Sequence, residues 1–552
     1  MPRWRAKSRP AGVRAGLARR LVALRLVALL ALGMAGLAGC SRAPSADSQP
    51  GRSEGPSAPP TASPAASPAA SPVATPVREP AAVLAEREVF EVCFLQGVRV
   101  GHTRTAIRRV AREGRTLVQV DSLTRLSLKR SATPIEVDGR QSSLETPEGQ
   151  LIEFSTSTSG GPVSMTTTGR VQRDRLLRQT TTTGRTETTS IPWSDRCGGL
   201  FAVPLGLARK PMQPGERRTV EALQAGDLQV AVTELVARDY EPVKLLAETK
   251  RLLRIDTTTT VAGHPLRETL WTDSAGEIWK TFSELLSLEA FRTTKEEALR
   301  ETAAAELDIV WSLSVPVSRR LESPHATKRV RYRVELAGGD AAALFPAGGT
   351  QQVRALEGGA AEVTVRAVRP GGPAGDPQPR PDAPTDADRR PNNWIQSDYP
   401  KIAAAAERAA AGRTDPWQVA VALEQATRRL ISKPGYRQAL DTAADVIESG
   451  SGDCTELAVL LAALARARGI PARVSIGLVY VAADQKFLYH MWDEVYIQGR
   501  WIPLDATLAQ GGIGAAHLKL AHSSFEGPSP YASILPVAQV AGKLKIEILE
   551  VE

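Results

Sequence analysis

The chain has 552 residues, of which 69 are lysine or arginine and 60 are aspartate or glutamate, so its formal net charge at pH 7 is +9. Eight of the basic residues and none of the acidic ones fall within residues 1–39, which leaves 61 basic against 60 acidic residues in the remainder. The remainder is therefore nearly neutral, and the charge gives no support for a nucleic-acid partner.

Residues 1–39 have the pattern of a secretory signal. A basic start is followed by an apolar run that is interrupted by Arg25 and is too short to span a bilayer comfortably. The run ends in Leu-Ala-Gly-Cys40, which resembles a bacterial lipobox. That resemblance implies removal of the signal, a lipid on Cys40, and a protein anchored in the cell envelope. Serine at position 41 resembles sorting to the outer membrane, facing the periplasm.

Residues 40–83 are rich in proline, alanine and serine, which predicts a disordered linker because this composition cannot bury a core. Residues 84–300 change to threonine-rich and apolar stretches separated by glycine-containing turns. This pattern predicts a mostly antiparallel β domain, with a strongly curved sheet or half-barrel as one arrangement. Cys93 and Cys197 could form a disulfide in an oxidising envelope, although the sequence does not place their Cα atoms.

The rest of the chain divides into three parts. A smaller β unit is expected at residues 301–369, then a Pro/Asp/Gly-rich linker at 370–391, and a C-terminal domain at 392–552. A final strand at 543–551 is expected to pack back on the C-terminal domain. The predicted fold class is thus multidomain, with an N-terminal mostly antiparallel β region followed by an α+β core.

Cys454 is expected in the first turn of a helix within that core. Asp453 followed by Glu456 fits a capping box, leucines follow at helical spacing, and Gly469 and Pro471 end the pattern. Unpaired N–H groups and the positive end of the helix dipole favour thiolate over thiol there. The alternative is that Cys454 is a small buried apolar residue.

Two predicted strands then carry His490 and Asp505. A two-residue turn at Gln498-Gly499 sets a register in which Trp492 faces Asp505, so that the carboxylate lies on the same sheet face as His490. A three-residue turn would place Asp505 on the opposite face. In the first register the carboxylate can fix the imidazole tautomer and leave the other nitrogen to take the thiol proton. A core histidine and a turn-forming aspartate are the alternatives.

Together these segments resemble a bacterial transglutaminase-like core domain, among the papain-like cysteine enzymes, over about residues 415–519. The matching residues are Gly452-Asp453-Cys454-Thr455-Glu456, Arg468 to Val474, His490-x-Trp492 with Glu494-Val495-Tyr496, and Trp501 through Asp505-x-Thr507. The resemblance implies Cys454 as nucleophile, His490 as general base and Asp505 as its orienting partner. Met491 and Ala506 stand where the family usually has alanine and proline, and neither difference removes a chemical group.

The expected function is that of an envelope-anchored cysteine enzyme that cleaves or transfers acyl groups at amide bonds of peptides or proteins, with no cofactor and no metal. Zinc, nucleotide and serine-hydrolase motifs find no match, and His517 and His522 are expected to be exposed loop residues. One alternative is a protease without transfer activity. Another is a non-catalytic binding or scaffold lipoprotein in which the β domains are the working part and the core is a degenerate relic. A third is that the β region carries hydrophobic ligands. The sequence does not set the oligomeric state.

Overall fold

The computed structural model describes residues 86–552 except 131–132, 160–163, 262–263, 301–306, 309–311, 370–381, 435–440 and 528–533. The expected signal peptide, the expected lipidation at Cys40 and the 40–83 linker lie outside the described residues, as does most of the 370–391 linker. None of the helices within the described ranges is both long and apolar enough to cross a membrane.

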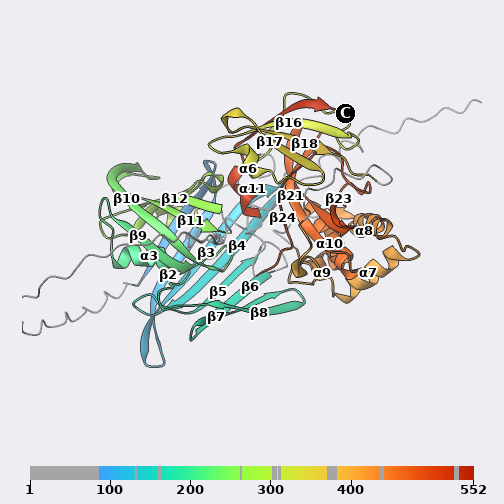
Figure 1. The fold of residues 1–552 in the computed structure, drawn as a ribbon. Coiled ribbons are helices and arrows are strands. Elements are labelled where there is room, and N and C mark those ends of the chain that lie inside the picture. Colours follow the sequence, from blue (N-terminus) through green and yellow to red (C-terminus); the bar gives the residue numbers. More distant parts are fainter. Residues whose placement is uncertain are drawn as a thin grey trace, which may run out of the picture.

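One antiparallel sheet of fourteen strands forms the N-terminal half of the described chain (Figure 1). Strand β1 lies in its middle, β2 to β8 follow in order on one side, and β14 to β9 follow in reverse order on the other. The prediction of a mostly antiparallel β region is confirmed. The strands are β1 (Arg87–Leu95), β2 (Val98–Arg112), β3 (Arg115–Arg130), β4 (Thr133–Glu145), β5 (Leu151–Ser159), β6 (Ser164–Gln172), β7 (Arg175–Thr182), β8 (Arg185–Pro192), β9 (Arg217–Leu223), β10 (Val230–Lys244), β11 (Thr249–Val261), β12 (His264–Thr272), β13 (Ile278–Ser283) and β14 (Leu288–Thr293).

The two halves of this sheet pack against opposite faces of one short helix, α3 (Ala202–Arg209). Leu205, with Phe201 just before the helix, packs against apolar side chains of β2, β3, β5 and β7. Val203 and Leu207, on the other face, pack against β10, β11 and β12. Because one helix contacts both halves, the sheet curves around α3, which is one of the arrangements that the sequence allowed.

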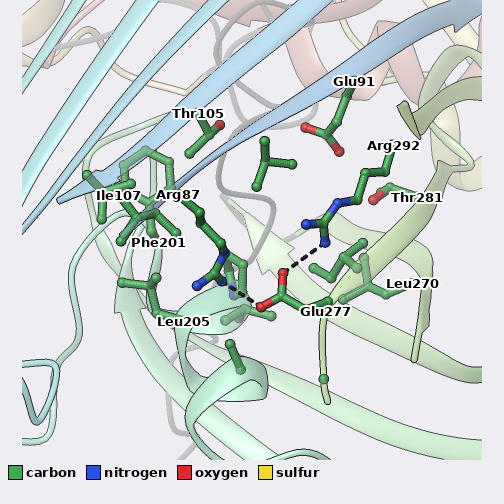
Figure 2. Close-up of a pocket in the computed structure, with 17 residues that line it drawn as sticks. Arg87, Glu91, Thr105, Ile107, Phe201, Leu205, Leu270, Glu277, Thr281 and Arg292 are labelled. Carbon is green, nitrogen blue, oxygen red and sulfur yellow. Dashed lines mark hydrogen bonds and ion pairs between the residues drawn. The ribbon is translucent and has the colours of Figure 1, made fainter. Parts of the chain in front are cut away.

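A cavity of about 110 Å³ lies beside α3 inside the curve of the sheet. Figure 2 shows that Glu277 bridges two arginines across it, at 2.7 Å from Arg87 and 2.8 Å from Arg292. Glu91 also lines the cavity, where burial raises the pKa of its carboxyl to about 7 against the opposing effect of Arg292. The cavity therefore combines apolar walls with a group of carboxylates and arginines whose opposite charges balance.

Cys93 and Cys197 are both free thiols. Cys93 belongs to the core that continues into the C-terminal region, whereas Cys197 belongs to the cluster around α3. Burial raises the pKa of both thiols. The disulfide that the sequence left open does not form, because the two residues lie in separate cores.

The C-terminal half contains a five-stranded sheet, a four-stranded sheet and a two-stranded parallel pair. In the five-stranded core sheet the order is β15-β22-β21-β24, and β23 also pairs with β22. Its strands are β15 (Val315–Pro316), β21 (Ala472–Val481), β22 (Lys486–Ile497), β23 (Arg500–Leu504) and β24 (His517–Ser523); the other two sheets contain β16 (Arg329–Leu336), β17 (Gln351–Ala355), β18 (Ala361–Arg366) and β25 (Leu544–Val551), and β19 (Lys433–Pro434) and β20 (Ser451–Gly452).

The last strand, β25, pairs with β16 in the four-stranded sheet. The sequence pattern predicted that it would pack back on the C-terminal domain. It contacts β15 of the core sheet and also completes the smaller β unit, because Ile546 and Ile548 join the buried residues of β16 to make one apolar face. The smaller unit is therefore built from two segments that lie far apart in the sequence.

Helices α7 to α10 gather beside the core sheet (Figure 1). They are α7 (Pro400–Ala410), α8 (Pro416–Leu430), α9 (Ala443–Ser449) and α10 (Cys454–Ala467). The remaining short helices are α4 (Lys295–Leu299), α6 (Ala341–Leu344) and α11 (Leu535–Val540), with 3-10 turns at Leu285–Ser287, Glu357–Gly359 and Asp386–Asp388. Helix α10 is buried almost all round, so it is the central element of the core.

Candidate active site

Cys454 is the first residue of α10, as predicted. The Asp453 side chain accepts a hydrogen bond from the Thr455 N–H at 2.9 Å, and Glu456 accepts one from the Asp453 N–H at 3.0 Å. This is the predicted capping box, and Gly469 at φ 72° follows the end of the helix. The Cys454 side chain is 1% exposed, so the thiol is held in the interior at the positive end of a buried helix.

The hairpin from β22 to β23 has the register that the sequence predicted. Its turn residues Gln498 and Gly499 have φ of 51° and 80°, the positive values that a two-residue hairpin turn of this kind requires. The ladder runs from Ile497 opposite Arg500 to Asp493 opposite Leu504, so Asp505 follows directly after it. The alternative three-residue turn is excluded.

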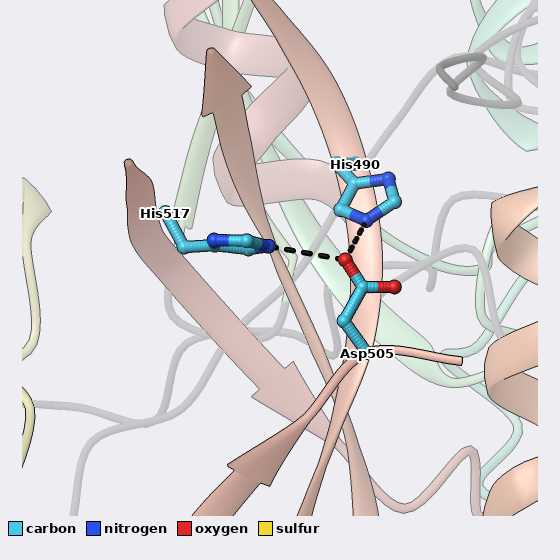
Figure 3. A group of neighbouring side chains, drawn as sticks. All are labelled: His490, Asp505 and His517. Atoms are coloured by element: carbon cyan, nitrogen blue, oxygen red, sulfur yellow. Dashed lines mark hydrogen bonds and ion pairs between the residues drawn. The ribbon is translucent and has the colours of Figure 1, made fainter. Parts of the chain in front are cut away.

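The imidazole of His490 and the carboxylate of Asp505 form a fully buried hydrogen bond, with 2.8 Å between Nε2 and Oδ2 (Figure 3). Among the described residues, Nδ1 of His490 has no partner at ordinary hydrogen-bond geometry. Burial alone lowers the pKa of His490, but the Asp505 carboxylate and then the Cys454 sulfur outweigh it and raise the value to about 10. The structure thus brings the three residues singled out from the sequence into one electrostatic group.

Asp505 accepts more than one hydrogen bond. Its Oδ2 also lies 3.1 Å from Nε2 of His517, and its Oδ1 accepts from the Thr507 N–H at 2.8 Å. Burial raises the pKa of this carboxyl, yet the two histidines outweigh burial and hold it well below its usual range. Asp505 therefore remains an anion in a fully buried position.

His517 contradicts the expectation of an exposed loop histidine. It is 2% exposed and lies at the start of β24, which pairs with β21 in the core sheet. His522, at the other end of the same strand, has a 37% exposed side chain, in agreement with the expectation of exposure. The sequence carried a signal for the start of this strand, because polar and apolar residues alternate from His517 to Leu520.

Glu424 of α8 is a second residue that sequence reasoning missed. Its fully buried carboxylate accepts from the backbone N–H of Asp505 at 3.1 Å, of Gly511 at 2.7 Å and of Gly512 at 3.4 Å. Burial raises the pKa of Glu424 to about 7. One side chain thus holds both ends of the loop that carries Asp505, which fixes the position of that carboxylate from the helical side.

Residues 403–506 match the family model described as the transglutaminase-like superfamily. This segment is a transglutaminase-like domain. The match covers most of α7, the helices α8 to α10, the hairpin and all three residues of the predicted triad. The comparison with curated proteins finds no match.

Solved structures give more distant similarities. A protein provisionally assigned as a cysteine protease, from Cytophaga hutchinsonii, is 16% identical, with a TM-score of 0.26, over 41% of this chain and 85% of that one. A β-barrel-like protein of a domain of unknown function, from Brucella abortus, is 9% identical, with a TM-score of 0.28, over 38% and 94%. The periplasmic domain of TgpA from Pseudomonas aeruginosa is 15% identical, with a TM-score of 0.19, over 54% and 86%.

Other side chains pack around Cys454, His490 and Asp505 and balance the charge there. Glu494 pairs with Lys519 at 2.6 Å and with Arg473 at 2.8 Å, and these cations outweigh burial and lower its pKa to about 2. The Trp492 ring packs against both His490 and His517, with centroids 6.1 and 5.3 Å away. These side chains fill and neutralise the surroundings of the triad.

The ligand atoms of His490, Asp505 and His517 all lie within 4.8 Å of one another, a spacing that could hold a metal ion. Hydrogen bonds of 2.8 and 3.1 Å already account for this closeness. Oδ2 of Asp505 faces both imidazoles, so the three side chains form one hydrogen-bonded cluster.

Proposed function

We propose that the transglutaminase-like domain is a papain-like cysteine enzyme that acts on amide bonds of peptides or proteins, with Cys454 as nucleophile, His490 as general acid and base, and Asp505 as the orienting carboxylate. The observation that carries this proposal is the different surroundings of the two ring nitrogens of His490. Its Nε2 is committed to an ionised, buried carboxylate, and its Nδ1 is left for a thiol that acts on the same ring.

The protonation states follow from this arrangement. With a pKa of about 10, His490 is an imidazolium at neutral pH, and the Cys454 sulfur is one of the groups that raise this pKa. A thiolate beside an imidazolium is the reactive form of a cysteine nucleophile. The thiolate attacks the carbonyl carbon of the substrate, and the backbone N–H of Cys454 at the start of α10 stabilises the oxyanion, because the N–H groups of Asp453 and Thr455 already bond to the capping side chains. His490 then gives its proton to the leaving amine, and an acyl-enzyme thioester remains.

The second half of the reaction releases the acyl group. His490, now neutral, takes a proton from water or from a primary amine, which attacks the thioester and regenerates the thiolate. Water gives hydrolysis and an amine gives transamidation. Since Cys454 is almost fully buried, neighbouring side chains must move before a substrate carbonyl can reach it. In this structure, Cys454 is shielded from bulk water. This exclusion of water governs the competition between water and amine as acyl acceptors.

Export and lipidation place this chemistry in the cell envelope. The basic and apolar residues 1–39 and the lipobox-like Leu-Ala-Gly-Cys40 support a lipid anchor, with the folded region facing the periplasm. A Cys40→Ala variant tests this location. We expect it to move from the membrane fraction to the soluble fraction, and wild-type protein in the soluble fraction would contradict the anchor.

Alkylation by iodoacetamide tests the nucleophile. Cys93 and Cys197 are buried thiols in the same chain and serve as internal controls. Peptide mapping is expected to show rapid labelling of Cys454 near neutral pH, slow labelling of the two controls, and slow labelling of Cys454 in His490→Ala. Equal and slow labelling of all three cysteines would contradict an activated thiol.

The acyl acceptor is tested separately with a glutamine-containing protein, with and without a fluorescent primary amine. Incorporation of the amine that disappears in Cys454→Ala indicates transamidation. Peptide fragments without incorporation, again dependent on Cys454, indicate a protease.

A further inference from the structure

His517 reaches the triad because of an irregularity in strand pairing. Strand β21 lies between β22 and β24, and Gly477 of β21 pairs with His490 on one side and with Lys519 on the other. The register of β21 with β24 shifts between Ile476 and Gly477. Such a shift is a β-bulge. If the pairing of β21 with β24 continued without it, His517 would lie opposite Tyr480, on the other face of the sheet. With the bulge it pairs with Val479, on the face that carries His490.

Gly477 leaves the space that this arrangement needs. A Cβ atom at this position would lie 2.1 Å from the Leu518 carbonyl oxygen and 2.8 Å from the Trp492 ring. Any side chain there would push apart β24 and the Trp492 ring, which packs against both histidines. The bulge and the glycine together bring His517 to within hydrogen-bond distance of Asp505.

The proton on His517 can be assigned from its partners. Nε2 faces the Asp505 carboxylate at 3.1 Å and Nδ1 faces the Gly514 carbonyl oxygen at 3.3 Å, and both partners are acceptors. Burial lowers the pKa of His517 and favours the neutral ring, which has one N–H to donate. The shorter contact to a charged acceptor is the stronger hydrogen bond, so the proton belongs on Nε2.

We propose that His517 is a positioning residue of the transglutaminase-like site: its Nε2–H holds Oδ2 of Asp505 in the orientation that aligns His490 with Cys454. This inference rests on the proposed function of the triad and adds a fourth member to it. His517 acts through Asp505 and does not touch the reacting atoms.

The charges around Asp505 explain why a second donor matters. Asp505 faces His490 and His517, but the buried carboxyls of Glu424 and Asp493 also lie within electrostatic range, and burial raises the pKa of both. Asp493 makes no hydrogen bond through either carboxylate oxygen within the described part of the chain. An anion in such surroundings is favoured only when donors compensate for its lost hydration. Without His517, one of the two imidazole donors to Oδ2 is lost.

The test compares two substitutions in the full chain. His517→Phe keeps an aromatic ring against Trp492 but has no donor, whereas the amide nitrogen of His517→Gln reaches about as far as Nε2 and can donate to Asp505. The rate of iodoacetamide labelling at Cys454 is measured as a function of pH, together with the thermal unfolding midpoint. His517→Leu replaces the Phe variant if that variant does not fold.

We expect the donor-free variant to label Cys454 about tenfold more slowly at neutral pH, because the imidazole loses its alignment. The Gln variant should stay within about threefold of wild type and keep its pH profile. Equal rates in all three proteins, or equal losses in both variants, would overturn the proposal, since the donor would then be irrelevant. A failure of the proposed triad would give a different result. Cys454 would then label at the same rate in wild type and in His490→Ala.

Discussion

Two buried carboxyl groups, Glu268 in the N-terminal sheet and Asp505 in the core, have pKa values that are shifted in opposite directions. In the N-terminal sheet, Glu268 is 6% exposed, and burial raises its pKa to about 8 against one opposing hydrogen bond from Ser283. In the core, Asp505 is fully buried, yet its pKa is held well below the usual range. The difference lies in the donors, because Asp505 receives two imidazoles and one backbone N–H.

Burial by itself therefore does not mark a reactive carboxylate in this protein. Glu145 and Glu91 of the N-terminal sheet behave like Glu268, because burial raises their pKa values to about 7. At neutral pH the Glu268 carboxyl is mostly protonated and acts as a neutral hydrogen-bonding side chain, whereas Glu145 and Glu91 are protonated only in part. At Asp505 the lost hydration is replaced by two imidazoles and one backbone N–H, which is the condition for a carboxylate that orients a base.

The largest effect is expected from Asp505→Asn, which removes the anion and keeps the shape. The rate of Cys454 labelling at neutral pH should fall by about 10²–10⁴-fold, because His490 loses its charged partner and its fixed tautomer. The matched variant Glu268→Gln replaces a carboxyl that is already neutral and should leave the rate unchanged. Similar labelling rates for Asp505→Asn and wild type would contradict the role of Asp505 as the charged partner of His490.

Glu424→Ala should cost about 3 kcal/mol of unfolding free energy, because three buried backbone N–H groups lose their acceptor. Urea denaturation measures this loss. Glu448, whose exposed carboxylate pairs with Lys401 at 2.8 Å, is the matched control. Its replacement by alanine should cost less than about 1 kcal/mol. Equal costs would show that the loop is not anchored by Glu424.

The pH dependence of stability separates the two kinds of carboxyl. The pKa of Glu268 is raised in the folded state from 4.5 to about 8, so the folded state binds this proton more tightly than the unfolded state. Its stabilising contribution is complete below about pH 4.5 and is lost as the pH rises through about 8. Asp505 has the opposite sign, since its lowered pKa contributes stability at neutral pH that is lost in acid.

Glu268→Gln should therefore remove part of the alkaline loss. Between about pH 6 and about pH 9 the unfolding free energy of wild type should fall by roughly 1–3 kcal/mol more than that of the variant. Urea midpoints at the two pH values measure the difference. Parallel profiles would mean that Glu268 does not titrate in this range.

The smallest effect concerns the hairpin that carries Asp505. Gly499→Ala places a side chain at φ 80° and should cost about 1 kcal/mol in thermal or urea unfolding. Gly206→Ala is the control, because this glycine lies within α3 and a Cβ there meets nothing within 4 Å. Substitution in that helix should be neutral or slightly stabilising. A neutral Gly499→Ala would show that the turn tolerates another conformation.

The sequence predicted those parts of the site that local chemistry determines. The capping box placed Cys454 at the start of a helix, and the glycine of the Gln498-Gly499 turn fixed the register that brings Asp505 to His490. His517 and Glu424 were missed because their roles depend on long-range packing. The bulge in β24 and the packing of α8 against the Asp505 loop leave no local pattern. The pairing of β25 with β16 was missed for the same reason.

The most direct test of the account is the ultraviolet absorbance of the Cys454 thiolate, which needs no reagent to enter the buried site. The difference spectrum between wild type and Cys454→Ala is recorded against pH, and again with His490→Ala in both backgrounds. The account predicts thiolate absorbance at neutral pH that is lost when His490 is replaced. The absence of thiolate absorbance at neutral pH in wild type, or its persistence without His490, would contradict the ion pair and the enzyme built on it.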